Sequence, residues 1–169
     1  MRTVNQTFRK GAIGALMDEY ERAASELRHL VETFNEEAFT QILDSRTNDE
    51  NCRSVQTIMS HVVSSGYSYA DYIRGAFSMA TDRPPKRLLS HRQALDAFDA
   101  MLTYTIRTLE GKWEMTDAAI QDVGIRARWG VTYDLEQILE HAIVHLLRHR
   151  RQIERLNKGV ATDGLGRGL

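Results

Sequence analysis

Two histidines four residues apart, His145 and His149, are the residues of this sequence best placed to do chemistry. They lie in a strongly helical segment, Leu135 to Leu156, and side chains at i and i+4 of a helix project from one face. Both imidazoles can therefore reach a single metal ion. On a helical wheel at about 100° per residue they also lie on the apolar side, where an unpaired polar ring is costly. Hydrogen-bonded core histidines and a shared cation are both compatible with this pattern.

A third ligand would favour the metal site, and the other histidines are the candidates. His29 is expected to face water, and His91 lies in the first turn of its helix near a bundle end. His61 lies at the border of an apolar stripe. Three residues on its side of the helix suit a pocket wall: Ser65, Ser68 and Tyr72. We therefore predict that His61, His145 and His149 are three neutral nitrogen ligands.

The residues that are missing argue against two kinds of metalloprotein. A di-iron carboxylate bundle needs several inward-facing glutamates, and neither Glu140 nor Glu154 is predicted to lie on the metal side of its helix. A zinc protease of the His-Glu-x-x-His type needs a glutamate after the first histidine, where this chain has Leu146. A three-histidine site instead leaves a coordination position open, where the nucleophile is a bound water or a bound thiol.

The composition of the chain limits its number of domains, its cellular compartment and its partners. The chain has 169 residues, a formal net charge of −1 and one cysteine, Cys52, which argues for a single domain in a reducing compartment. No nucleic-acid partner is expected, since the basic run from Arg148 to Arg151 radiates around its helix. No apolar run approaches the ~20 residues that span a bilayer, so we expect no membrane partner and a cytoplasmic protein.

Hydrophobic periodicity predicts an all-α fold, a four-helix bundle. The first helix is expected from Ile13 to Phe34, and the second from Ser54 to a point before Pro84. The third is expected to begin at the capping box of Ser90 and Gln93 and to run toward Gly111. The fourth is expected from near Thr132 to Asn157–Gly159.

The remaining segments are expected to connect these helices. Residues 35–51 are predicted to form a folded loop or a short turn of helix. In the long connection 114–131, between the third and fourth helices, apolar and polar residues partly alternate, which would suit a short β-ribbon. We assign residues 1–158 to one bundle domain and residues 159–169 to a flexible, glycine-rich tail.

The last helix resembles the DinB/YfiT superfamily of bacterial four-helix bundles, whose signature is His-x-x-x-His-Arg-Gly-Gln. This chain has His145, His149, Arg150 and Gln152 in that pattern, with Arg151 in place of glycine, and His61 resembles the single histidine of the second helix. The resemblance implies a three-histidine divalent metal site, commonly zinc or nickel, and frequent homodimerisation. It also implies that thiol S-transferase activity with a low-molecular-weight thiol such as bacillithiol or mycothiol occurs among relatives. The arginine in place of glycine at position 151 is expected to affect how this helix packs against its neighbours or a partner chain.

Three functions remain open from the sequence. The leading hypothesis is a metal-dependent thiol S-transferase acting on a small molecule, and the alternatives are a metal-dependent hydrolase and a non-catalytic metal-binding bundle. No residue is assigned a catalytic role. The pocket, or the shell of residues around the ligands, is predicted to include His141, Ser65, Tyr69, Tyr72, Trp129 and Gln152, and further aromatic candidates are Trp113 and Tyr133.

Overall fold

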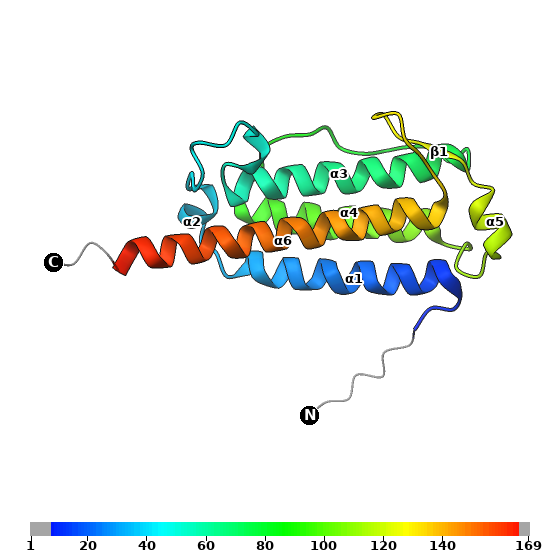
Figure 1. Ribbon diagram of the computed structural model, residues 1–169, viewed down its shortest axis with the longest axis horizontal. Coiled ribbons are helices and arrows are strands. Elements are labelled where there is room, and N and C mark those ends of the chain that lie inside the picture. The colour runs from blue at the N-terminus through cyan, green and yellow to red at the C-terminus, as the bar shows by residue number, and fades with distance from the viewer. Residues whose placement is uncertain (1–7, 166–169) are drawn as a thin grey trace, which may run out of the picture.

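Four long helices lie side by side along the longest dimension of the molecule (Figure 1). The computed structural model describes the backbone of residues 8–165 and the side chains of residues 8–157. The long helices are α1 (Gly11–Glu32), α3 (Val55–Ala76), α4 (His91–Leu109) and α6 (Leu135–Leu165). Shorter elements join them: α2 (Glu36–Thr40), the 3-10 turn η1 (Glu50–Cys52), α5 (Asp117–Gln121), β1 (Ile125–Arg126) and β2 (Thr132–Tyr133). The predicted all-α four-helix fold is confirmed.

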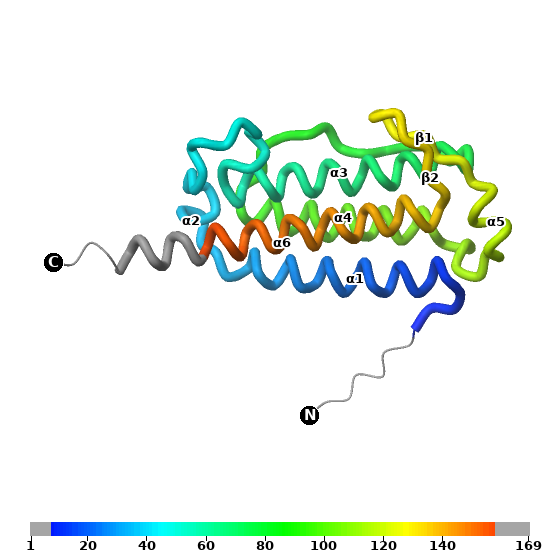
Figure 2. The backbone as a smooth tube through the Cα atoms, viewed as in Figure 1, coloured from blue at the N-terminus to red at the C-terminus, as the bar shows by residue number. Residues whose placement is uncertain are grey.

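The helices form a ring in which α1 contacts α4 and α6, and α3 contacts the same two helices. Helices α3 and α4 run in the same direction, opposite to α1 and α6, and the segment 77–90 returns along α3 to make this possible (Figure 2). Gln56, near the start of α3, donates to the Leu89 carbonyl at 3.0 Å, and Arg74, near its end, donates to Thr108 at 2.7 Å. The pairing of α3 with α6 brings His61 close to His145 and His149.

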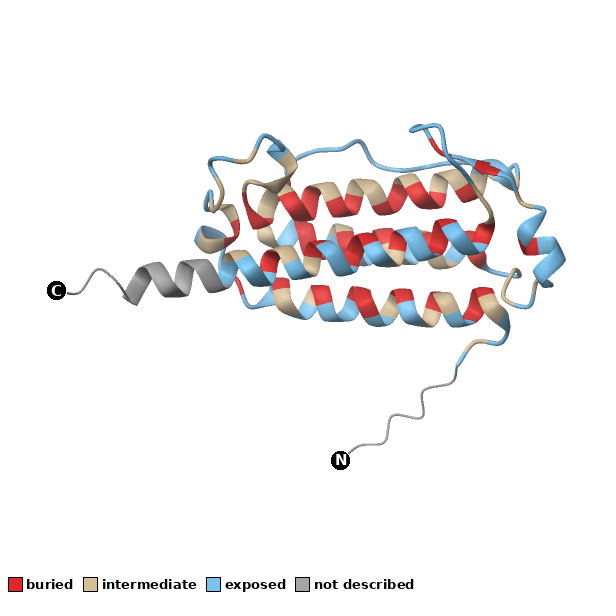
Figure 3. Cartoon of the chain, in the orientation of Figure 1, coloured by how far each residue is buried: buried red, intermediate tan, exposed pale blue. Residues whose placement is uncertain are grey.

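The buried faces of the four helices turn toward a common core (Figure 3). Its largest fully buried side chains include Tyr20, Phe98 and Met101, contributed by α1 and α4. Two capping boxes fix where α3 and α4 begin, and they pair Ser54 with Thr57 and Ser90 with Gln93. A capping box satisfies amide groups that the first helical turn leaves without partners. The predicted starts of these two helices are therefore confirmed.

The connections differ in detail from the sequence prediction. The segment 35–51 contains α2 and the start of η1, as expected of a short turn of helix. In the long connection, Ile125 pairs with Tyr133 across an antiparallel β1–β2 ribbon whose turn includes Gly130 at φ +89°. This confirms the β-ribbon, whereas α5 was not predicted.

Helix α3 ends at Ala76, before Pro84 as predicted, and Ser78 just beyond it adopts a positive φ of 53°. Helix α6 begins at Leu135 rather than near Thr132, since Asp134 caps it by accepting from the Gln137 amide at 2.8 Å. It extends to Leu165, past the predicted end. The predicted flexible tail, 159–169, lies outside the residues whose side chains are described and stays a prediction.

The surface of α6 keeps two apolar side chains, Val144 and Leu147, at 61% and 38% exposure. An exposed apolar pair is a feature of association surfaces, and the expected homodimer stays a prediction. Within the described residues, no helix combines the length and the hydropathy needed to cross a membrane.

Candidate metal centre

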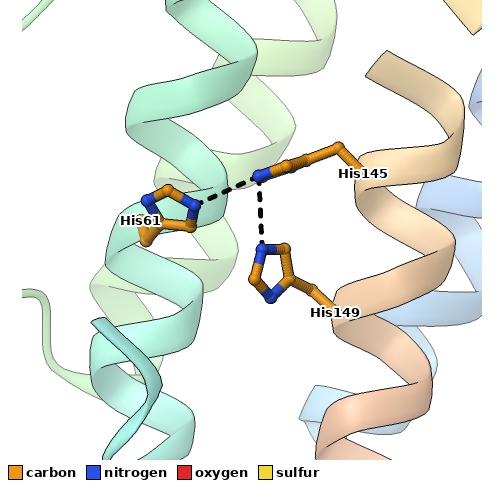
Figure 4. Close-up of side chains that lie close together, drawn as sticks. All are labelled: His61, His145 and His149. Carbon is orange, nitrogen blue, oxygen red and sulfur yellow. Dashed lines mark hydrogen bonds between the residues drawn. The ribbon is translucent and has the colours of Figure 1, made fainter. Parts of the chain in front are cut away.

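Three imidazoles meet between α3 and α6 (Figure 4). The Nε2 atom of His145 lies 3.1 Å from Nε2 of His61 and 3.2 Å from Nε2 of His149. Two nitrogens that each lie about 2.0–2.1 Å from a tetrahedral zinc ion are separated by roughly 3.3–3.4 Å. The observed separations are close to that value, and the three ligand atoms form a group that could hold a metal ion.

Hydrogen bonding alone cannot satisfy this arrangement. A neutral imidazole nitrogen carries either one hydrogen or one lone pair, so it makes one good hydrogen bond. The Nε2 atom of His145 faces two ring nitrogens at once. A cation placed between the three rings would accept all three lone pairs. The residues present therefore fit a divalent ion better than they fit a set of core hydrogen bonds.

Burial keeps these rings neutral. His145 and His149 are 6% and 3% exposed, and His61 is half-buried. Burial lowers the pKa of His145 to about 3, with further lowering from the neighbouring His149 and His61. Burial likewise lowers the pKa of His149 to about 4, against the raising effect of its hydrogen bond to Gln152. The pKa of His61 is also lowered, mainly by burial. Neutral imidazole is the form that binds a metal.

Gln152 sets the orientation of one ring. Its Oε1 atom lies 2.9 Å from Nδ1 of His149, so the amide oxygen accepts the Nδ1–H hydrogen. This places the lone pair of His149 on Nε2, which is the atom that faces His145. An outer hydrogen bond of this kind fixes the tautomer and raises the basicity of a metal-binding histidine. Gln152 therefore contacts one of the three grouped histidines on the side of the ring that faces away from the other two.

No fourth ligand joins the group within the described part of the chain. The set of neighbouring histidine, cysteine and carboxylate groups contains His61, His145 and His149 alone. Cys52 lies close by, but its Sγ donates to Asp49 at 3.4 Å and is not one of the grouped atoms. Structural zinc sites usually have four protein ligands, whereas catalytic sites keep one position open.

A pocket of about 180 Å³ opens beside His61 and His145. The predicted pocket residues that line it are Ser65, Ser68, Tyr69, Tyr72, Trp129 and His141. It contains aromatic rings in edge-on and stacked contacts. Tyr69 meets His145 edge-on with ring centroids 5.6 Å apart, and Trp129 stacks on His141 at 5.5 Å. The β1–β2 ribbon brings Trp129 to this position, and burial raises the pKa of Tyr69 to about 12, so its hydroxyl stays protonated.

Comparison with protein families identifies the chain. The sequence model of the DinB family matches residues 2–158. The chain belongs to the DinB family. Comparison with curated proteins gave no match. Family membership together with three close histidines suggests a divalent metal site, and it leaves the reaction to be argued from the site itself.

Two positions of the DinB-like signature are explained by their contacts. Arg150 forms ion pairs with Glu26 of α1 and with Glu154 one turn further along α6. It therefore ties α6 to α1 and does not face the histidines. Arg151, which replaces the usual glycine, is exposed and lines a second hollow of about 560 Å³. This hollow also adjoins His61 and His149.

Three residues at this DinB-family site were missed from the sequence. Arg148 lines both hollows, Arg128 lines the smaller one, and Asp49 lines the larger one. Arg148 follows His145 by three residues, and this spacing was a usable signal for its position beside the site. Asp49 and Arg128 lie in connections, where periodicity gives no direction. Conversely, Trp113 lines neither hollow, since it packs under the Arg9 guanidinium at 5.1 Å.

Proposed function

We propose that this chain is a divalent-metal-dependent enzyme of the thiol S-transferase type, with His61, His145 and His149 as ligands of zinc or nickel. The observation that carries the proposal is the convergence of three neutral ring nitrogens beside a pocket, without a fourth ligand among the described residues. A divalent ion held there would lower the pKa of a bound thiol, so that the thiol is present as thiolate at neutral pH.

The surroundings support a reaction between two molecules. Hollows of about 180 Å³ and 560 Å³ both adjoin His61 and Arg148. A thiol and an electrophile each need space next to the reacting atom, whereas water needs little. In the smaller hollow, Tyr72 and Trp129 form an aromatic wall with ring centroids 5.8 Å apart. Such a wall positions an apolar part of a small-molecule substrate and excludes water from it.

A metal-dependent hydrolase is the second candidate, because the structure places one carboxylate, Asp49, at the larger hollow. A hydrolase needs a proton acceptor near the reacting water. However, Asp49 accepts from the Asn51 amide at 2.9 Å and from Cys52, and these bonds stabilise the η1 turn. The hydrogen bond from the Asn51 backbone is the largest of the effects that lower the pKa of Asp49. The Asp49 carboxylate is therefore a weak base. The transferase is therefore the better supported of the two.

A non-catalytic metal-binding bundle is the third candidate. It would be favoured by a closed set of four protein ligands. Within the described residues the group contains three histidines and a pocket adjoins it. Both observations argue against a non-catalytic bundle.

The test begins with elemental analysis of protein purified without a histidine tag. Conjugation of small cellular thiols with a generic electrophile is then compared between metal-loaded wild type and His145→Ala. We expect a loss of about 10³–10⁴-fold on removing this ligand, in line with the several kcal/mol that a metal ion supplies. The matched control is His29→Ala, because His29 is exposed on α1 and hydrogen-bonds only locally to Ser25. Unchanged turnover in fully metal-free protein would refute the proposal.

A further inference from the structure

The hollow beside His61 and His145 is lined by two arginines and by no acidic residue. Arg128 comes from the turn of the β1–β2 ribbon, and Arg148 comes from α6, so two separate elements bring positive charge to one pocket. Its other lining side chains are serine, tyrosine, tryptophan and histidine groups. The pocket therefore has a net positive charge before any metal ion is considered.

These two guanidinium groups have no acidic partner among the residues whose side chains are described. Some arginines elsewhere in the fold do have acidic partners: Arg83 lies 3.2 Å from Asp71, and Arg28 lies 2.8 Å from Asp99. Neither Arg128 nor Arg148 takes part in any ion pair of the described chain. Both are thus free to bind a ligand.

The two guanidinium groups lie beside the proposed metal centre, because the hollow that they line also includes His61 and His145. The carboxylate of Asp49 lines the larger hollow instead, where it accepts from Asn51 and Cys52. The proposed metal would add two more positive charges, since three neutral imidazoles contribute none. A metal ion beside two guanidinium groups that lack acidic partners would favour an anion in this hollow.

We infer that Arg128 and Arg148 bind a carboxylate of the reacting molecule, so that the substrate of this site is a small acid whose carboxylate lies a few bonds from the group that reaches the histidines. The inference rests on the proposed metal centre and names its substrate class. A carboxylate is favoured because its planar shape matches the guanidinium fork. A pocket of about 180 Å³ also admits only a small molecule.

The test compares two thiols of equal shape, 3-mercaptopropionate and its neutral amide, 3-mercaptopropionamide. Each is titrated into the full-length protein loaded with cobalt(II), and binding is followed by the thiolate-to-cobalt charge-transfer absorption. We expect the acid to bind about tenfold more tightly, as for a charge-assisted hydrogen bond at an exposed position. Added salt should reduce this preference.

Variants then locate the preference. Arg128→Gln and Arg148→Gln should each reduce it, and the double variant should abolish it, while the amide binds as before. The matched control is Arg126→Gln, an exposed arginine of the same ribbon that does not line the hollow, and it should keep the full preference.

The outcomes separate this inference from the proposed function. Equal binding of acid and amide, a preference that survives in the double variant, or failure of both thiols to bind cobalt-loaded protein would overturn the carboxylate site. The wild-type comparison needs no variant and decides the question even if a variant fails to fold. Failure of wild-type protein to bind cobalt at all would instead overturn the metal centre, and this inference with it.

Discussion

Replacing Gln152 by leucine tests the outer support of the metal centre. The change removes the acceptor that lies 2.9 Å from His149 Nδ1 and keeps a side chain of similar size. His149 is 3% exposed, so its N–H would be left buried without a partner, which costs about 1–3 kcal/mol. The loss of such outer partners typically weakens metal binding by about 10–100-fold. A 10–100-fold change corresponds to about 1.4–2.7 kcal/mol, so the two estimates agree.

The assay is a competition titration of zinc against a chromophoric chelator, with thermal unfolding of the metal-free protein measured in parallel. Gln152→Glu is the informative companion variant, because a charged acceptor strengthens the bond to Nδ1–H and should raise the affinity. The matched control is Gln121→Leu, which makes the same substitution at an exposed position of α5. We expect no change in zinc affinity for this control.

An unchanged zinc affinity in folded Gln152→Leu protein would refute the reasoning. It would mean that the packing of His149 alone fixes its ring and that the hydrogen bond to Gln152 is incidental. An equal loss in Gln121→Leu would refute it too, since the effect would then not depend on the site.

Three further predictions concern pH, stability and the pocket. In metal-free protein, the free energy of unfolding should fall as the pH drops below about 6.5, because the unfolded chain binds protons at His145 and His149 while the fold holds their pKa values at about 3 and about 4. Urea titrations between about pH 7.5 and pH 5 measure this, and a flat profile would contradict it. Ser54→Ala should destabilise the protein by about 1 kcal/mol in the same assay through loss of its bond to Thr57, and no change would mean that the cap of α3 contributes nothing. Trp129→Ala should raise KM and leave the zinc content unchanged, whereas loss of zinc would show that the ribbon supports the ligands.

The helical parts of the site could be predicted because helix periodicity fixes which side chains share a face. The i, i+4 spacing placed His145 and His149 together, and the position of His61 at a stripe border placed it on a pocket wall. The capping box at Ser90 marked the start of α4 in the same way. These are local rules, and they hold whatever the order of helices around the core.

The connections could not be predicted to the same depth, since no local rule gives their direction. Asp49 and Arg128 reach the site through the η1 turn and the ribbon, and only the tertiary packing of these segments places them there. The parallel course of α3 and α4 depends on the extended segment 77–90, whose length is compatible with several paths. Periodicity identifies the buried face of a helix and leaves its direction in the bundle open.

The spacing of four residues that brings His145 and His149 together does not allow His141 to join them at one ion. His141 lies four residues before His145, on the same side of α6, and so looks like a ligand by spacing alone. At about 1.5 Å per residue, however, it lies about 12 Å along the axis from His149, which is too far for both rings to bind one ion at about 2 Å. The third nitrogen of a shared ion would therefore have to come from another helix, and Nε2 of His61 on α3 lies 3.1 Å from Nε2 of His145. His141 instead stacks on Trp129 with an interplanar angle of 25°, which places its ring on the pocket wall, where it is available to a substrate.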